Sequence, residues 1–531
     1  MARAVYDPAI HWRDDGASPP LGRAKVSWVQ QLRLGCLALR GYPSARLAYA
    51  LILADDGEHR RALRQFAQAA HGGLPHAQFR LGRCYLLGLG VPSGLDAALR
   101  WLTKAAHGCD VEAQVLLASL ALQGISMDAQ AGLFEPATRH AGQPADYQMA
   151  LHWGRQAADA GSAEAQTLVG YILTSGPEEL RDLPRAAQYY RQASESGFAQ
   201  GQLGWALALL RDGASPAVDA EAWRLLESAA KADLPAAHFA LGVLAEQAVA
   251  EQALVEQAEH NPGRLTTGTA HYREAAERGH RSAQFRYGIA LLTGRGVKQD
   301  TQSGETWLRR AGLAGEPLAA AMVGDIYARQ GDGQPNFCEA ALWFERAAEA
   351  GHIGAARALG QVCLRGGGFG TDPVSAAHWL RVAATADDLV AAYELGICLA
   401  HGISTTRNDA EALQWFRRAI GVMPEALYWV ARMMDEGRGT AQDPTAARAL
   451  YLRAAAEGNG DAAMAAGEML VNGRGGLPDR PAAMRLFVGA AARGHKGAQY
   501  ALSVLEPAND TGASAIGASG TGTSGGEALA V

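Results

Sequence analysis

Three short motifs in the sequence carry residue types that enzymes use. Ser228 and Lys231 form an SxxK motif, in which serine is the nucleophile of penicillin-recognising enzymes. The segment 522–526 contains the GxSxG pattern of a hydrolase nucleophile elbow. The segment 366–370 is rich in glycine, as a phosphate-binding loop is. The 15 histidines, by contrast, include no HExxH zinc motif.

None of the three motifs has the companion residues that its chemistry requires. No Lys-Thr-Gly or Ser-Asp-Asn accompanies the SxxK motif, and neither Lys-Ser nor Lys-Thr follows the glycine-rich loop. The GxSxG pattern lies in a tail of Gly, Ser, Thr and Ala, without the strand and helix that form a nucleophile elbow. We therefore expect no catalytic residues, no cofactor and no metal site.

Composition excludes further classes of function. Hydrophobic residues make up 48% and charged residues 19% of the 531 residues, and the net charge of -6 includes no block of Lys or Arg. A nucleic-acid-binding protein would show a basic stripe, so no nucleic-acid partner is expected. No apolar segment reaches 18 residues, so we expect no transmembrane segment.

The six cysteines lie far apart, and no two form a CxxC pair. They are Cys36, Cys84, Cys109, Cys338, Cys363 and Cys398. Disulfide frameworks and zinc sites group their cysteines, so we expect buried, reduced thiols and a cytoplasmic location. The segment 32–36 resembles a lipoprotein signal, but no apolar run precedes it, and residues 1–16 carry charges instead.

The sequence also repeats with a period of 36 residues, and such a repeat outweighs any local motif. Four tryptophans at this spacing each precede an alanine by four residues: Trp307, Trp343, Trp379 and Trp415. Because they hold a fixed place in the repeat, we expect them to form part of its core, not a stacking platform for nucleic acid. A second series, usually Leu-Gly, runs in step with them. Its members are Ala50, Gly82, Ala118, Gly170, Gly204, Gly242, Gly288, Gly324, Gly360, Gly396, Ala431 and Gly467.

One unit of the repeat shows how it is expected to fold. Residues 283–292 have apolar side chains at helical spacing, and the glycines of 294–296 can end that helix in a left-handed C-cap. Asp300 can cap a second helix, which runs to a stop at Gly315. Gly288 lies inside the first helix, where glycine costs about 1 kcal/mol relative to alanine. We expect close approach of the second helix to require it.

A hairpin of two short helices cannot bury its apolar face alone, whereas stacked hairpins can. The predicted fold is therefore an all-α solenoid of about twelve antiparallel helix hairpins over residues 44–505, ending in half a unit. Residues 1–43 form an N-terminal extension, in which 26–34 is predicted to form an amphipathic helix that caps the first repeat or docks elsewhere. The Gly/Ser/Ala-rich tail 506–531 is expected to be disordered.

Two steps of the glycine series are longer than the rest, at 52 and 46 residues. The extra residues lie around 125–145 and 248–267. Surface loops tolerate long insertions and often contact partners. We expect both insertions to be surface loops, either structurally neutral or in contact with a partner.

The repeat unit resembles a known family. It reads Ala-x-x-x-Leu-Gly-x-x-Tyr/Leu, Gly-x-Gly-Val, a capping Asp, Ala-x-x-Trp-x-x-x-Ala-Ala and then Gly-His, the last at 279–280, 351–352 and 494–495. This pattern is similar to that of Sel-one-like repeat (SLR) proteins, which are relatives of the tetratricopeptide repeat (TPR). The resemblance implies a right-handed, TPR-like α-solenoid whose first helices line a concave face. It also implies a role in assembling bacterial envelope, exopolysaccharide, secretion or signalling complexes.

By analogy with TPR grooves, the residues three before and one after the Leu-Gly glycine are expected to face the concave surface. Aromatic and charged residues recur there, which suits recognition of a peptide or a helix. The predicted partner-binding residues are Phe79, Arg83, Tyr171, Trp205, Phe239, Phe285, Tyr393, Tyr428 and Arg432. Packing of these aromatic residues within the solenoid is the alternative interpretation.

The function expected from the sequence is a non-enzymatic, cytoplasmic scaffold or adaptor that binds protein partners. The sequence leaves its oligomeric state open. One alternative is a secreted or periplasmic SLR protein, although this chain lacks the pair of cysteines that secreted members have in each repeat. A second alternative is an enzyme that interacts with β-lactams, since some members of the resembled family have been linked to β-lactam binding.

Overall fold

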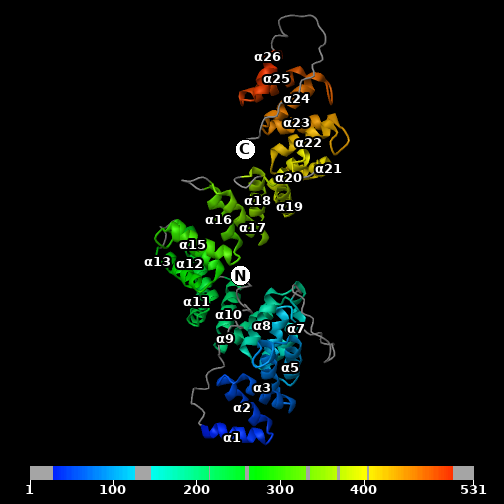
Figure 1. Ribbon diagram of the computed structural model, residues 1–531. Coiled ribbons are helices and arrows are strands. Elements are labelled where there is room, and N and C mark those ends of the chain that lie inside the picture. The colour runs from blue at the N-terminus through cyan, green and yellow to red at the C-terminus, as the bar shows by residue number, and fades with distance from the viewer. Residues whose placement is uncertain are drawn as a thin grey trace, which may run out of the picture. The chain divides into compact units, whose positions relative to one another are not determined.

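The computed structural model describes residues 28–125, 145–213, 216–256, 262–329, 335–366, 371–403 and 406–505. These residues contain 26 α-helices and no strand, which confirms the all-α prediction (Figure 1). The chain folds as two compact units, residues 1–304 and 305–531. The tail, the GxSxG motif and most of the first insertion lie outside the described residues.

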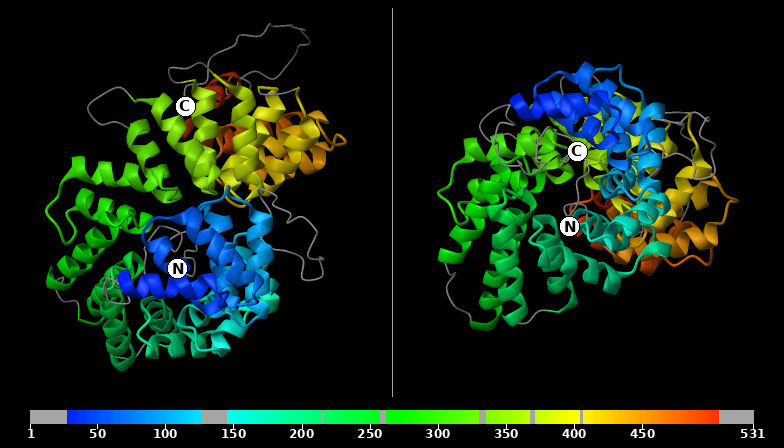
Figure 2. Two further views of the ribbon diagram at one scale, coloured as in Figure 1. Left: turned by 60° about the horizontal axis from the view of Figure 1, so that its bottom comes forward. Right: turned by 90° about the horizontal axis from the view of Figure 1, so that it is seen from below.

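The first unit consists of helices that each pack against the next along the chain (Figure 2). They are α1 (Trp28–Leu39), α2 (Pro43–Asp55), α3 (His59–His71), α4 (Pro75–Leu87), α5 (Leu95–His107), α6 (Val111–Leu122), α7 (Tyr147–Asp159), α8 (Ala163–Ser175), α9 (Leu183–Glu195), α10 (Ala199–Asp212), α11 (Pro216–Lys231), α12 (Pro235–Glu256), α13 (Pro262–Glu277) and α14 (Arg281–Thr293). A short 3-10 helix, Glu178–Leu180, joins α8 to α9.

The second unit has the same design. After α15 (Thr301–Leu313), which contains the boundary between the units, its helices are α16 (Pro317–Arg329), α17 (Phe337–Glu349), α18 (Ile353–Arg365), α19 (Pro373–Thr385), α20 (Leu389–His401), α21 (Asp409–Ala419), α22 (Pro424–Glu436), α23 (Pro444–Ala456), α24 (Gly460–Asn472), α25 (Arg480–Ala492) and α26 (Lys496–Leu505). The even-numbered helices from α2 to α24 each contain one member of the Leu-Gly series. The twelve predicted repeats and the final half unit are therefore confirmed.

Helix ends follow the caps that the sequence indicates. Gly294 adopts a left-handed conformation (φ 69°) and ends α14, and Gly366 from the glycine-rich motif ends α18 in the same way (φ 67°). The Asp300 carboxylate accepts a hydrogen bond from the Ser303 amide at 3.1 Å, which caps α15. The glycine-rich motif therefore begins as a turn, as expected for this point of a repeat.

The close helix approach predicted around the glycine series is confirmed. A Cβ atom added to Gly396 in α20 would lie 2.7 Å from Cε1 of Phe416 in α21. A Cβ added to Gly360 would lie 2.8 Å from Cγ of Leu380 in the same way. Real Cβ atoms do not approach other atoms so closely, so a large side chain of the second helix occupies the space that the glycine leaves.

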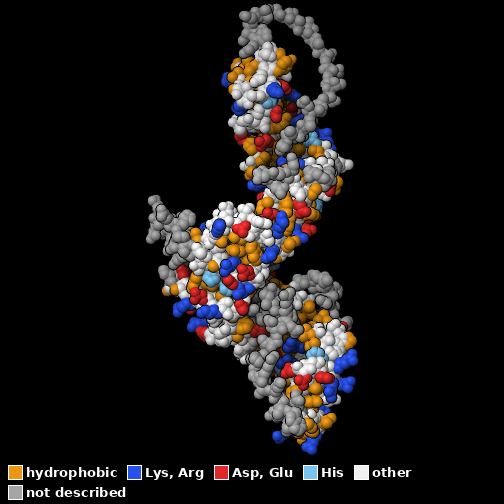
Figure 3. Space-filling view, turned by 60° about the vertical axis from the view of Figure 1, so that its left-hand side comes forward, with side chains coloured by type: hydrophobic (Ala, Val, Ile, Leu, Met, Phe, Trp, Pro, Cys, Tyr) orange, Lys and Arg blue, Asp and Glu red, His pale blue; other side chains and the backbone are white. Residues whose placement is uncertain are grey.

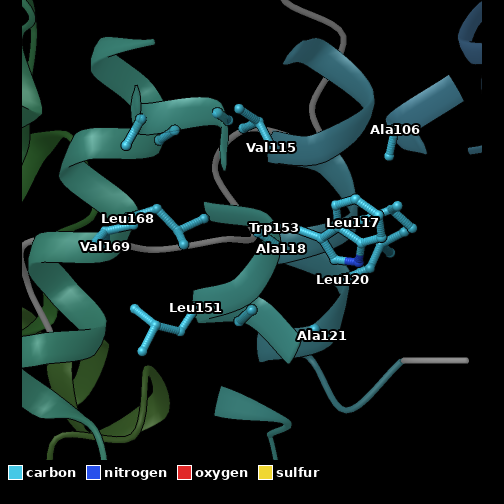
Figure 4. Close-up of a cluster of buried hydrophobic side chains, with 14 of the residues drawn as sticks. Ala106, Val115, Leu117, Ala118, Leu120, Ala121, Leu151, Trp153, Leu168 and Val169 are labelled. Carbon is cyan, nitrogen blue, oxygen red and sulfur yellow. The ribbon is translucent and has the colours of Figure 1, made fainter. Parts of the chain in front are cut away.

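The tryptophans were expected to form the core, and this is wrong for most of them. Trp153 is buried with 5% of its surface exposed, in a cluster with Leu117 and Leu120 (Figure 4). The tryptophans of the other clear repeats are only partly buried: Trp101, Trp307, Trp343, Trp379 and Trp415. In four of these repeats, the residue after the tryptophan packs on the glycine instead: Leu102, Phe344, Leu380 and Phe416. Consecutive residues lie about 100° apart on a helix, so only one of the two can face the core.

The second insertion is mostly helical and not a loop. It lengthens α12 to 22 residues and α13 to 16, whereas α14 has the usual 13. Residues 248–256 are Ala, Val, Glu, Gln and Leu, without the glycines that end the other first helices. Most of these residues favour helix, so α12 continues where the other first helices stop.

The cysteine prediction is partly confirmed. The six thiols are all free, and Cys84, Cys363 and Cys398 are buried. The other three cysteines, Cys36, Cys109 and Cys338, are exposed, although burial was expected. Burial raises the pKa of the Cys84 and Cys398 thiols to about 11, so both are protonated at neutral pH.

Candidate partner-binding surfaces

The first helices of the second unit carry three of the predicted partner-binding residues. Tyr393 in α20 is half-buried against the core residue Phe416, with ring centroids 5.9 Å apart. Tyr428 in α22 is half-buried and packs against Tyr451 at 5.8 Å. Arg432 lies one helical turn after Tyr428, with its guanidinium 5.4 Å from the ring centre of Trp429 and its Nε donating to Glu436 at 2.8 Å. Neighbouring rings therefore hold all three side chains in place.

The first unit carries the other six predicted residues, and their exposure differs. Phe79 is only 4% exposed and belongs to the core, with the guanidinium carbons of Arg80 and Arg83 each 5.8 Å from its ring centre. Arg83 is partly exposed and covers that buried ring. Tyr171 and Trp205 are partly buried and pack against the same core cluster. Of these four side chains, only Phe79 is buried, so it cannot belong to a binding surface.

Phe239 and Phe285 complete the set on α12 and α14. Phe239 stacks on His280 with ring centroids 4.6 Å apart and planes 20° apart. Phe285 is partly buried. Stacking therefore holds the Phe239 ring in place.

The Gly-His histidines have a structural role that the sequence did not reveal. His280, His352 and His495 each accept a hydrogen bond at Nδ1 from the backbone amide three residues later, at 3.2, 2.9 and 3.2 Å. Each imidazole therefore caps the first helix of the next repeat, which requires an unprotonated Nδ1. Burial, and then the nearby Arg281 charge, lower the pKa of His280 to about 4, so this cap is intact at neutral pH.

Ion pairs between repeats form a second feature that we did not predict from the sequence. In the turn Gly437–Gly439, both glycines have positive φ, and the guanidinium of Arg438 between them reaches back to the preceding repeat. Its Nη2 donates to the Ala400 carbonyl at 2.8 Å and to Asp409 Oδ1 at 2.7 Å. Hydrogen bonds from Arg407 and then from Arg438 lower the pKa of Asp409 to about 2. The Gly-Arg-Gly turn recurs in the sequence, and this recurrence could have indicated that its arginine has a structural role.

Of the three motifs that suggested chemistry, only the SxxK motif lies wholly within the described residues. Its Ser228 and Lys231 are both exposed near the end of α11. Within the described ranges, no group of three or more His, Cys, Asp or Glu residues is arranged to hold a metal ion. None of the described helices is long and apolar enough to cross a membrane. On the face in Figure 3, basic and acidic side chains are interspersed among hydrophobic ones.

Stacked helix hairpins with mixed aromatic and charged side chains on their first helices define a TPR-like helical repeat protein. The chain belongs to the Sel1 repeat family, because the family model matches ten repeats that together cover more than half of it. The matched residues are 75–108, 128–162, 163–198, 198–234, 281–316, 317–352, 353–388, 389–420, 424–459 and 460–495. The SLR resemblance is therefore confirmed.

Individual relatives match more weakly. Chitin synthase regulatory factor 3 of Schizosaccharomyces pombe is 28% identical over 33% of this chain and 18% of its own length. Chitin synthase regulatory factor 4 of the same yeast is 30% identical over 26% of this chain and 19% of its own length. The chain thus spans about a fifth of the length of these relatives. The crystal structure of c5321, a protective antigen of uropathogenic Escherichia coli with an SLR fold, is 22% identical, covering 84% of this chain and 90% of that one, with a TM-score of 0.49.

Proposed function

We propose that this chain is a non-enzymatic scaffold that binds protein partners through the exposed faces of its first helices. The observation that carries the proposal is the set of half-exposed aromatic residues at one repeat position. Three of them are held by a neighbouring ring: Tyr393 by Phe416, Tyr428 by Tyr451 and Phe239 by His280. Pre-ordered aromatic and arginine side chains supply most of the binding energy in protein interfaces. We place Phe79 in the core and leave it out of the proposed surface.

The cellular context is a further part of the proposal. Two relatives are named as regulators of chitin synthase, and the family resemblance points to envelope, exopolysaccharide, secretion or signalling complexes. We infer that this chain assembles such a complex and works in the cytoplasm, where its six free thiols would stay reduced.

Combined replacement of Phe285, Tyr393 and Arg432 by alanine tests the proposed surface. We expect this variant to recover at least about tenfold less of the proteins that co-purify with the wild type, because each substitution removes a contact anchor. Quantitative mass spectrometry of tagged protein purified from its native host gives the measurement.

A matched variant controls for general effects of three truncations. Leu342, Val382 and Val488 lie on second helices and are 60%, 38% and 54% exposed. Alanine at these three positions should leave recovery unchanged. Equal recovery by both variants would remove the first-helix surface from consideration, provided that both keep the helical content of the wild type.

A further inference from the structure

A pocket lies within the first unit, between α12, α13 and α14. Its cavity volume is about 80 Å³, and Leu265, Ile289 and Ala290 provide apolar lining. Gly242 and Gly268 face each other in it, since a Cβ added to Gly268 would lie 3.3 Å from the Gly242 carbonyl oxygen. The pocket therefore forms at the repeat that carries the helical insertion.

The polar side of the pocket has more positive than negative charge. The Glu246 carboxylate accepts a hydrogen bond from the Tyr272 hydroxyl at 2.9 Å. Nη1 of Arg286 lies 3.4 Å from Glu246 Oε2, and Nη1 of Arg295 lies 3.4 Å from Oε1. The two arginine side chains are 49% and 54% exposed. Two guanidinium groups, each with five N–H donors, thus share one carboxylate, and about half of each arginine side chain is exposed.

Another repeat has the pair formed by the turn arginine and the helix carboxylate, and it shows this pair without a second arginine. Arg474 and Arg295 both stand in the middle of a Gly-Arg-Gly turn, and Asp435 and Glu246 both lie four residues after the small residue of the Leu-Gly series. Arg474 pairs with Asp435 one to one, with Nη2 2.8 Å from Oδ1. Arg286 is therefore an additional cation beyond the turn-to-helix pair.

We propose that this pocket binds a carboxylate group of a partner protein between the guanidinium groups of Arg286 and Arg295. Arginine binds carboxylates through two parallel hydrogen bonds, and a single negative charge neutralises the excess of one positive charge. A phosphate dianion would leave net negative charge beside Glu246, so a carboxylate fits better. The apolar lining suits an aliphatic residue next to the carboxylate. The proposal rests on the proposed partner-binding function. Ile289, which lines the pocket, lies one residue after the glycine of its repeat, as the predicted partner-binding residue Tyr171 does.

Binding of short peptides to the full chain tests the proposal directly. The side-chain methyl signal of Ile289, observed by NMR with isoleucine methyl labelling, reports on the pocket. Acetyl-Leu-Glu-Leu-amide offers a side-chain carboxylate, acetyl-Leu-Leu offers a terminal carboxylate, and acetyl-Leu-Gln-Leu-amide offers none. We expect a saturable shift with at least one carboxylate peptide and none with the glutamine peptide. The peptide that shifts the signal identifies the source of the carboxylate.

Three substitutions then separate the charge argument from a loss of structure. Arg286→Gln should weaken carboxylate binding at least about tenfold, because it removes a charged hydrogen-bond donor. Glu246→Gln should strengthen it several-fold, because it removes the competing negative charge. Arg474→Gln disrupts the one-to-one pair of another repeat and should leave binding unchanged.

Several results would overturn the proposal. These are the absence of any Ile289 shift with both carboxylate peptides, an equal shift with the glutamine peptide, tighter binding of inorganic phosphate, or weaker binding after Glu246→Gln. The carboxylate proposal and the scaffold function can fail independently, because different experiments test them. The peptide titration uses purified protein alone, whereas the scaffold function is tested by recovery of native partners.

Discussion

Replacement of Gly396 by alanine is expected to destabilise the second unit by about 1–3 kcal/mol, although alanine favours helix over glycine by about 1 kcal/mol. The new Cβ would lie 2.7 Å from Cε1 and 2.9 Å from Cδ1 of Phe416. The Phe416 ring is fully buried and stacks on Trp429, with centroids 5.5 Å and planes 9° apart. Since the ring cannot move away, α20 and α21 must separate.

A second glycine in the same unit provides the control. Gly489 lies within helix α25, and a Cβ added there would meet no atom within 4 Å. Gly489→Ala should therefore stabilise the protein by up to about 1 kcal/mol. Denaturant unfolding gives both free energies, and hydrogen exchange of α20 and α21 locates the loss, since repeat proteins can open locally. A stabilising effect of both substitutions would contradict the role assigned to the glycine series.

Replacement of Arg438 by alanine is the second substitution with a large expected effect, a loss of about 2 kcal/mol at neutral pH. The Arg438 side chain is 16% exposed and that of Asp409 is 20% exposed, so solvent screens this pair only partly. The substitution also leaves the Ala400 carbonyl without its donor from the next repeat. Equilibrium unfolding at pH 7 measures the loss.

The pH dependence of this loss gives an independent check. The folded pKa of Asp409, about 2, lies below the ordinary value of 3.8, so its contribution to stability is fully present above pH 3.8 and is lost as the pH falls towards 2. The difference between wild type and Arg438→Ala should therefore shrink below pH 3.8. Arg191 pairs with Glu195 at 3.0 Å on the surface, and Arg191→Ala should change stability by less than about 0.5 kcal/mol. An equal effect of the two substitutions would count against the bridging role of Arg438.

The repeat architecture was predictable because it depends on local rules that recur twelve times. Glycine stops, aspartate caps and apolar spacing placed the hairpins correctly, and the tight contact at Gly396 follows from a glycine inside a helix. The role of the tryptophans was not predicted correctly. A tryptophan series and the series one residue after it have the same period, and periodicity alone does not show which one faces the core.

The candidate sites were less predictable, because they depend on contacts between repeats. The Arg438–Asp409 pair joins residues 29 apart in sequence, and the pocket at Glu246 exists only because α12 continues past its usual end. The sequence placed Phe79 at the same repeat position as Tyr393, yet one is core and the other half-exposed. The exposure of a residue at this repeat position depends on the side chains around it, such as the two arginines that lie over Phe79.

The most direct test of the central claim is side-chain footprinting of the chain in its native complex. Hydroxyl radicals modify exposed aromatic and aliphatic side chains, and mass spectrometry compares each residue between the free chain and the purified complex. The scaffold account predicts protection of Phe285, Tyr393 and Tyr428 on the first helices, with Leu342 and Val488 on the second helices as reactive as in the free chain. Protection of Leu342 and Val488, with Phe285, Tyr393 and Tyr428 unchanged, would contradict it.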